Sequence, residues 1–210
     1  MSLLLKNIYQ AVTFNDKDEV LKEVDILVNG RKIESIGKNL TVEEGTEIID
    51  CTGLLALPGF VNTHHHLYQT LFRGIQEVQE MPLFPWLTGL YEFWKHLTPE
   101  AVYYGALVGF SELLRTGCTT SMDHHYVFPK NQPSTLIDEQ IKAASEIGIR
   151  FHATRGSMSR GKSEGGLPPD SVVQSSDEIL EDSERLIDKY HDNSKFAMHR
   201  IALAPCSPFS

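Results

Sequence analysis

Three consecutive histidines, His64, His65 and His66, end an apolar run in the stretch GFVNTHHHLYQT. An extended strand alternates its side chains between two faces, so His64 and His66 are expected to share one face and His65 to lie on the other. Two imidazoles two positions apart can reach one ion, and histidine is a usual zinc ligand at about 2.0–2.1 Å. His64 and His66 are therefore candidate ligands of a divalent metal. His65 is expected to be a hydrogen-bonded residue between sheet and helices. The alternative is that all three are ordinary strand-end histidines, because a His-X-His pair alone is a weak signal.

The segment before this stretch is predicted to be β-structure. Residues 1–57 contain five short extended runs, at 3–5, 11–14, 24–28, 32–36 and 47–50. Asn29-Gly30 is typical of a two-residue hairpin turn. Short strands with hairpin connections predict a small sandwich or meander.

From residue 58 onward, predicted strands alternate with predicted helices. The strands are expected at 59–66, 118–123, 150–154 and 200–204, and the helices at 98–115, 134–147 and 175–190. Such an alternation predicts an α/β domain over 58–210 with a parallel sheet. Residues 67–97, rich in aromatic side chains, and residues 156–174 are long connections of the kind that form lids or binding loops.

Composition limits the classes of partner. The formal net charge of -9 argues against nucleic acid and against an anionic membrane surface. No apolar run approaches the roughly 18 residues that a membrane span needs. The three cysteines show no close pairing, which predicts a reducing, cytoplasmic setting without a disulfide framework.

The stretch LALPGFVNTHHHLYQT resembles the signature with which the metal-dependent hydrolases of the amidohydrolase superfamily begin their barrel. Asn62 stands where many members have Asp. Four further stretches resemble the branch of 8-oxoguanine deaminase and hydroxydechloroatrazine ethylaminohydrolase: PLFPWLTGLYEFWKHLTPE, GCTTSMDHHYVFP, RFHATRGSMSRGKSEGGLPPD and LAPCSPFS. The resemblance implies a (β/α)8 TIM-type barrel of which residues 58–210 form the first four strands. It also implies that residues 1–57 are a partial β-sandwich accessory domain.

The resemblance also implies a chemistry. Members of this family hold one divalent metal, zinc most often and iron in some, at the mouth of the barrel. The metal lowers the pKa of its bound water toward roughly 7. The resulting hydroxide attacks a ring carbon that bears an amino group, and ammonia or an amine leaves. We therefore expect a metal-dependent aminohydrolase of an oxidised purine or a similar N-heterocycle. A triazine or guanine hydrolase of the same branch is the alternative.

Four further residues are candidates for substrate binding: Gln69, Arg155, His125 and Trp86. Gln69 can hydrogen-bond a purine or triazine edge, or be a solvated residue at a helix start. Arg155 ends the third barrel strand, where a fixed guanidinium can hold a ring carbonyl or a carboxylate. His125 can face the pocket, as can its neighbour His124, or make structural hydrogen bonds. Trp86 can cover a planar ring or pack within a lid.

The chain ends at Ser210, directly after the fourth predicted strand, whereas a full barrel takes about 250 residues. The family places two more metal ligands and the catalytic Glu on later strands, so no catalytic residue is assigned within 1–210. We expect the chain alone to be inactive. The alternative is a non-catalytic half-barrel that needs a partner chain. Unpaired sheet edges predict association, and we expect a homo-oligomer.

Overall fold

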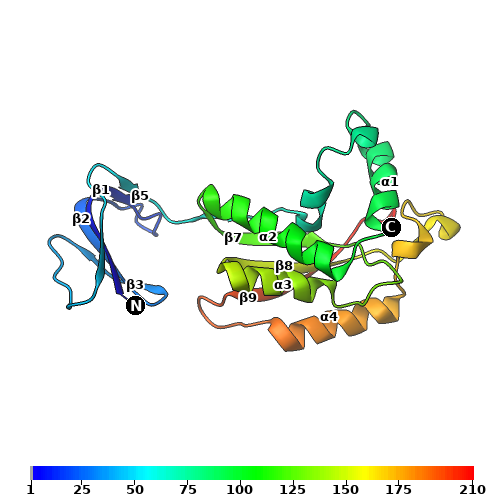
Figure 1. Cartoon of the computed structure of the whole chain (residues 1–210). Helices are drawn as coiled ribbons and strands as arrows, with labels where there is room; N and C mark the ends of the chain where they lie inside the picture. Colours follow the sequence, from blue (N-terminus) through cyan, green and yellow to red (C-terminus); the bar gives the residue numbers. More distant parts are fainter. Residues whose placement is uncertain (1) are drawn as a thin grey trace. The chain divides into compact units, whose positions relative to one another are not determined.

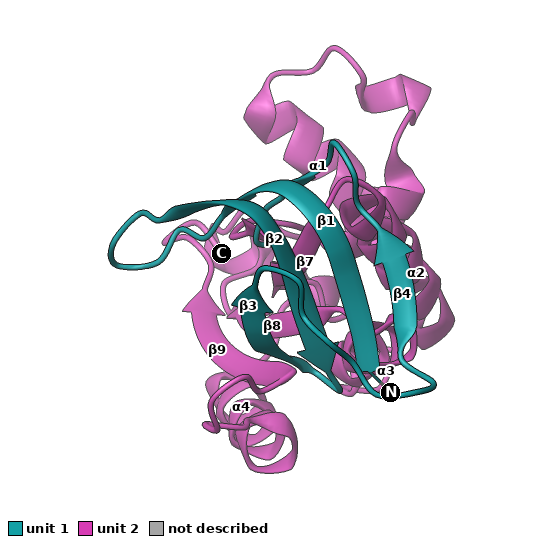
Figure 2. Ribbon diagram, turned by 90° about the vertical axis from the view of Figure 1, so that its left-hand side faces the viewer, with its two compact units in different colours: residues 1–59 teal, residues 60–210 magenta. Residues whose placement is uncertain are grey.

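The computed structural model describes residues 2–210 and divides into two compact units, residues 1–59 and residues 60–210 (Figure 2). The division falls two residues after the predicted boundary at 57/58. Within the described chain, no helix has the length and apolar character needed to cross a membrane.

Unit 1 is a single mixed sheet. Its strands are β1 (Ser2–Val12), β2 (Val20–Asn29), β3 (Lys32–Gly37), β4 (Glu47–Asp50) and β5 (Leu55–Ala56). The sheet order is β3-β2-β1-β4, and β5 also pairs with β1. The hairpin predicted at Asn29-Gly30 is confirmed, with Gly30 at a positive φ of 60° and Asn29 paired with Lys32.

Two details of unit 1 were predicted wrongly. The runs at 3–5 and 11–14 belong to one strand, β1, which continues through a register shift between Leu5 and Ile8. β4 and β5 are parallel to β1 rather than joined to it in a meander. β4 pairs with Leu3–Lys6 and β5 with Gln10 and Ala11, because β1 is long enough to carry the two strands one after the other.

Unit 2 contains the predicted parallel sheet. Its strands β6 (Phe60–Asn62), β7 (Cys118–His125), β8 (Arg150–Ser157) and β9 (His199–Pro205) lie in that order, and all three pairings are parallel. Helices α2 (Pro99–Arg115), α3 (Leu136–Ile147) and α4 (Ser176–Tyr190) pack against β7, β8 and β9 respectively (Figure 1). The main core lies between these helices and the sheet.

The predicted helix ends are confirmed by their caps. Thr98 Oγ1 accepts a hydrogen bond from the backbone N–H of Ala101 at 3.2 Å. Ser175 and Glu178 form a reciprocal capping box at the start of α4. Gly148 ends α3 with a positive φ of 81°, which glycine adopts without steric cost. Local sequence therefore fixes the starts of α2 and α4 and the end of α3.

The two long connections have structure of their own. Residues 67–97 form two 3-10 turns, η1 (Leu67–Phe72) and η2 (Gln76–Val78), and a helix, α1 (Leu83–Trp94), which the sequence analysis missed. Its apolar residues recur at helical spacing, so the signal was present. Residues 156–174 contain two short turns, η3 (Lys162–Glu164) and η4 (Asp170–Val172).

Candidate functional site

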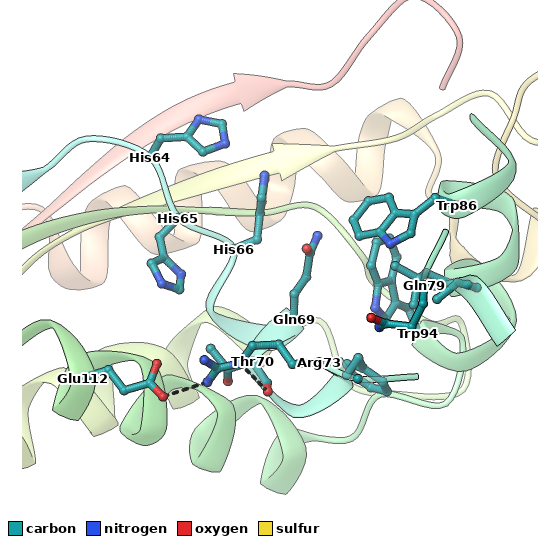
Figure 3. Close-up of a pocket in the computed structure, with 14 residues that line it drawn as sticks. His64, His65, His66, Gln69, Thr70, Arg73, Gln79, Trp86, Trp94 and Glu112 are labelled. Atoms are coloured by element: carbon teal, nitrogen blue, oxygen red, sulfur yellow. Dashed lines mark hydrogen bonds and ion pairs between the residues drawn. The ribbon is translucent and has the colours of Figure 1, made fainter. Parts of the chain in front are cut away.

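The histidine segment begins where β6 stops. The strand ends at Asn62, whose Oδ1 accepts a hydrogen bond from the backbone N–H of His64 at 2.9 Å. The prediction of a strand running through His66 was therefore too long. His64 and His66 nevertheless lie on one side of the backbone and His65 on the other (Figure 3). The rings of His64 and His66 meet edge to face, with centroids 4.9 Å apart.

The ring of His66 is held in one orientation. Its Nδ1 lies 2.8 Å from the carbonyl oxygen of His124, and a carbonyl can only accept, so Nδ1 carries the proton. Nε2 is then left with its lone pair. Burial lowers the pKa of His66 to about 4, although the bond to His124 opposes this shift. His66 is thus neutral at pH 7, the form in which histidine ligates a metal.

His64 and His66 fit part of a metal site. They supply two nitrogen donors on one side of the chain, and His64 is exposed. Across residues 2–210 no group of three or more His, Cys, Asp or Glu side chains is arranged to hold a metal ion. Because structural and catalytic zinc sites use three or four protein ligands, the pair is an incomplete donor set.

His65 lies against α2, as predicted. An added Cβ on Gly109 of that helix would lie 3.6 Å from Cε1 of His65. Burial, followed by the charge of Arg73, lowers the pKa of His65. Its Nδ1 is buried and has no hydrogen-bond partner within the described residues, so the predicted hydrogen bond is not found at that nitrogen.

A pocket of about 480 Å³ opens beside the histidines (Figure 3). It is lined by aromatic, amide and charged side chains from residues 64–90 together with Trp94 and Glu112. Gln69 and Trp86, both predicted to bind substrate, are among them. The Gln69 amide nitrogen lies 3.3 Å from the Tyr68 hydroxyl and 3.5 Å from that of Tyr126. A planar polar ring suits such a lining, since flat rings can stack while the amide pairs with their edge.

Arg73, Glu112 and Trp94 line this pocket and are among the lining residues that were not predicted from the sequence. Arg73 and Glu112 form an exposed ion pair of 3.0 Å at its wall. They are 39 residues apart, and no local pattern links them. Trp94 is fully buried, and its Nε1 has no hydrogen-bond partner in the part of the chain that the structure describes. Trp94 is the last residue of α1, a helix that was not predicted from the sequence.

A second pocket, of about 310 Å³, is also lined by His66. Its lining includes His124, Tyr126 and Cys206. His124 is the predicted alternative to His125, and its Nε2 lies 3.0 Å from the carbonyl oxygen of Ala204. Burial raises the pKa of the Cys206 thiol to about 11, so the thiol stays protonated and forms wall rather than nucleophile.

Arg155 and His125 line neither of these pockets. The side chain of Arg155 is 0% exposed, binds Asp182 at 2.9 Å and lies over the ring of Phe128. His125 is fully buried, with Nε2 3.0 Å from the carbonyl oxygen of Val127. His125 shares the buried face of β7 with Ser121 and Asp123. Arg155 is buried because its guanidinium is paired with Asp182 of α4. Their role in substrate binding stays a prediction, and their position does not favour it.

Comparison with known proteins places this geometry in context. The family described as "Amidohydrolase family" matches residues 55–210. The 8-oxoguanine deaminase of Pseudomonas aeruginosa is 47% identical over 88% of this chain and 41% of its own length. The hydroxydechloroatrazine ethylaminohydrolase of Pseudomonas sp. (strain ADP) is 36% identical over 98% of this chain and 45% of its own length. The zinc complex of atrazine chlorohydrolase TrzN from Arthrobacter aurescens TC1 superimposes with a TM-score of 0.88 at 37% identity, over 99% of this chain and 47% of that one.

These comparisons confirm the resemblance read from the sequence, including its branch. The chain spans less than half of the length of each of the three relatives.

Proposed function

Because the chain belongs to the amidohydrolase family, we propose that it is part of a metal-dependent hydrolase that removes an amino group from an N-heterocycle. The observation that carries this proposal is the pairing of His64 and His66, whose ring centroids are 4.9 Å apart. The Nδ1–H of His66 donates a hydrogen bond to the backbone carbonyl of His124. An oxidised purine is the proposed substrate class, supported by the 47% identity to an 8-oxoguanine deaminase. In this proposal the sheet of unit 2 is the first half of a (β/α)8 barrel, and unit 1 is part of a β-sandwich.

His64 and His66 would hold one divalent ion, zinc in the first place. When bound, such an ion supplies an activated water near neutral pH. The chain's own contribution is to present Nε2 of His66 unprotonated and fixed, because Nδ1–H donates to His124. The zinc complex of a solved relative supports the choice of metal. Iron remains the second choice.

The pocket beside the histidines would hold the heterocycle. Its volume of about 480 Å³ falls within the roughly 300–1,000 Å³ of small-molecule sites. Trp86 would cover one face of the ring, and the Gln69 amide would bind its edge. The two residues lie on η1 and α1, within the long aromatic connection, so the order of that connection determines how the ring is oriented.

Zinc binding tests the metal part of the proposal. Titration calorimetry of the 210-residue chain should show weak binding that is lost in His64→Ala and His66→Ala. His96→Ala is the matched control, because His96 is an exposed histidine of the same unit. Equal binding by all three variants would contradict the assignment.

We propose that the 210-residue chain alone does not release ammonia from 8-oxoguanine, because two donors do not complete a zinc site. A clean preparation that releases ammonia would overturn this. A full-length relative carrying the same residues should be active, and ethylamine release from hydroxydechloroatrazine would favour the triazine alternative, which the 36% identity to that enzyme supports.

A non-catalytic half-barrel that associates with a partner, or with a second copy, is the candidate of a different class. It is supported by exposed apolar residues on the edge strands, Phe60, Val61 and Leu203. Size-exclusion chromatography with light scattering tests it, since a monomer of 23.6 kDa would contradict association. We also propose a cytoplasmic location for the protein, which cell fractionation tests.

A further inference from the structure

We infer that Asp123 is a positioning residue that fixes the ring of His66 by anchoring the backbone of Leu67. The inference rests on the proposed function, in which His66 is a metal ligand. Asp123 lies on the buried face of β7, two residues before the strand ends at His125, and is 0% exposed. One of its carboxylate oxygens, Oδ1, accepts a hydrogen bond from the Leu67 N–H at 2.6 Å.

This bond is one of three that join the histidine segment to the end of β7. The backbone N–H of His124 donates to the carbonyl oxygen of His65 at 2.8 Å. His66 Nδ1–H donates to the carbonyl oxygen of His124 at 2.8 Å. The third bond, from the Leu67 N–H to Asp123, lies on the C-terminal side of His66, whereas the bond to His65 lies on its N-terminal side. The backbone is therefore held on both sides of His66, whose ring proton is donated to the His124 carbonyl.

The carboxylate of Asp123 is itself fixed. Gln140 on α3 donates from Nε2 to Oδ2 of Asp123 at 2.7 Å. Gln140 and Leu67 are also 0% exposed, so water does not compete for these bonds. A buried donor that loses its only acceptor carries the full desolvation cost, which makes the arrangement strongly preferred. The link thus runs from α3 through Asp123 to the residue that follows His66.

The chemistry of this link predicts which substitutions preserve it. Asp123 must accept at one oxygen from Leu67, and an asparagine keeps that acceptor. Its amide nitrogen would then face Gln140, whose Oε1 is buried and has no partner among residues 2–210. A turn of the Gln140 amide lets Oε1 accept from the asparagine. Asp123→Asn should therefore retain the anchor, whereas Asp123→Ala removes it.

The experiment measures the tautomer of His66 in the metal-free 210-residue chain. Two-bond ¹H–¹⁵N NMR of the histidine-labelled protein should show His66 as a single species protonated at Nδ1. In Asp123→Ala we expect a mixture of both tautomers, and in Asp123→Asn a return to the wild-type pattern. An unchanged pattern in a folded Asp123→Ala protein would overturn the inference.

Asp182→Asn is the matched control. Asp182 is a buried carboxylate of the same unit, but it binds Arg155 and Arg185 and not the histidine segment. Its replacement should lower the melting temperature and leave the His66 tautomer unchanged. If Asp123→Ala does not fold, Gln140→Leu tests the same link: a mixed His66 pattern supports the inference, and a wild-type pattern overturns it.

Zinc titration of the same variants separates the inference from the proposed function. Loss of a residue that orients a ligand typically weakens metal binding by about 10–100-fold, and we expect this for Asp123→Ala but not for Asp123→Asn. If the wild-type chain binds no zinc while the tautomer still depends on Asp123, the proposed function fails and the positioning role stands. Zinc binding equal to wild type in Asp123→Ala contradicts the inference alone.

Discussion

The two units use buried polar groups very differently. All nine histidines lie in unit 2, and none lies in residues 1–59. Among the described residues, Asp25 is the single buried polar or charged residue of unit 1, whereas unit 2 has eight such residues. Burial of polar groups costs free energy unless they are paired. Unit 2, which carries the candidate site, therefore has most of the buried polar groups that must be paired by hydrogen bonds or ion pairs.

The comparison is closest between two aspartates. Asp25 accepts from the backbone N–H groups of Asn7 and Leu40 at 2.9 and 3.0 Å, and so holds the irregular part of β1 beside a loop. Asp123 accepts from the backbone N–H of Leu67 and so holds the histidine segment. In both units a buried carboxylate accepts a hydrogen bond from a backbone amide. In unit 1 this holds the register shift of β1, and in unit 2 it holds the segment that carries the candidate metal ligands.

The largest expected effect is a core cavity confined to unit 2. Phe110→Ala removes a fully buried ring that packs against Phe151 at a centroid distance of 5.0 Å. Such a deletion costs about 3–5 kcal/mol of unfolding free energy. Native-state hydrogen exchange should show the loss in β7 and β8. Equal loss of protection in β1 would show that the two units unfold together, and would contradict the prediction that the loss is confined to unit 2.

Acid should destabilise unit 2 in particular. Burial lowers the pKa of His66 to about 4 and that of His125 to about 3, from an ordinary 6.5. A base with a lowered folded pKa contributes stability above pH 6.5, and this contribution is lost as the pH falls toward the folded value. Each pKa unit is worth about 1.4 kcal/mol. We expect the unfolding free energy of unit 2 to fall by several kcal/mol between pH 7 and pH 4.

Asp123 should oppose that trend. Burial raises its pKa to about 7, so the folded state binds its proton more readily than the unfolded state does, and acid favours folding at this residue. The variant Asp123→Asn removes this opposing contribution. Its unfolding free energy should therefore fall more steeply than that of the wild-type chain between pH 7 and pH 4 in urea denaturation. A shallower fall would contradict the assigned protonation states.

Two glycines are required for different reasons in the two units. An added Cβ on Gly156 would lie 2.6 Å from the His125 carbonyl oxygen, so Gly156→Ala overpacks unit 2 and costs about 1–3 kcal/mol. Gly30 has open space around its Cα but a φ of 60°. Asparagine tolerates that backbone, so Gly30→Asn should be mild and Gly156→Asn severe. Thermal denaturation checks both, and equal losses would contradict the distinction.

The smallest effect is at a helix cap. Ser175→Ala removes the oxygen that accepts from the Glu178 N–H at 3.2 Å and should cost about 1 kcal/mol. Amide exchange in the first turn of α4 should increase, with β1 as the internal control because unit 1 has no α-helix in its described residues. Ser175→Asp, which can also cap, should restore most of the protection.

The sequence by itself determined the elements and part of the site. The caps at Thr98 and Ser175, the stop at Gly148 and the alternation of strands and helices follow from local rules of hydrogen bonding and side-chain period, and these held. The pairing of His64 with His66 also followed from spacing alone. Such features depend on residues a few positions apart, which a sequence displays directly.

Tertiary structure decided the rest. Arg155 turns inward because Asp182, 27 residues away, supplies its counter-charge in the core. Asp123 meets Leu67 across 56 residues. These contacts join segments that only the packed sheet and helices bring together, so their energies have no signature in local sequence.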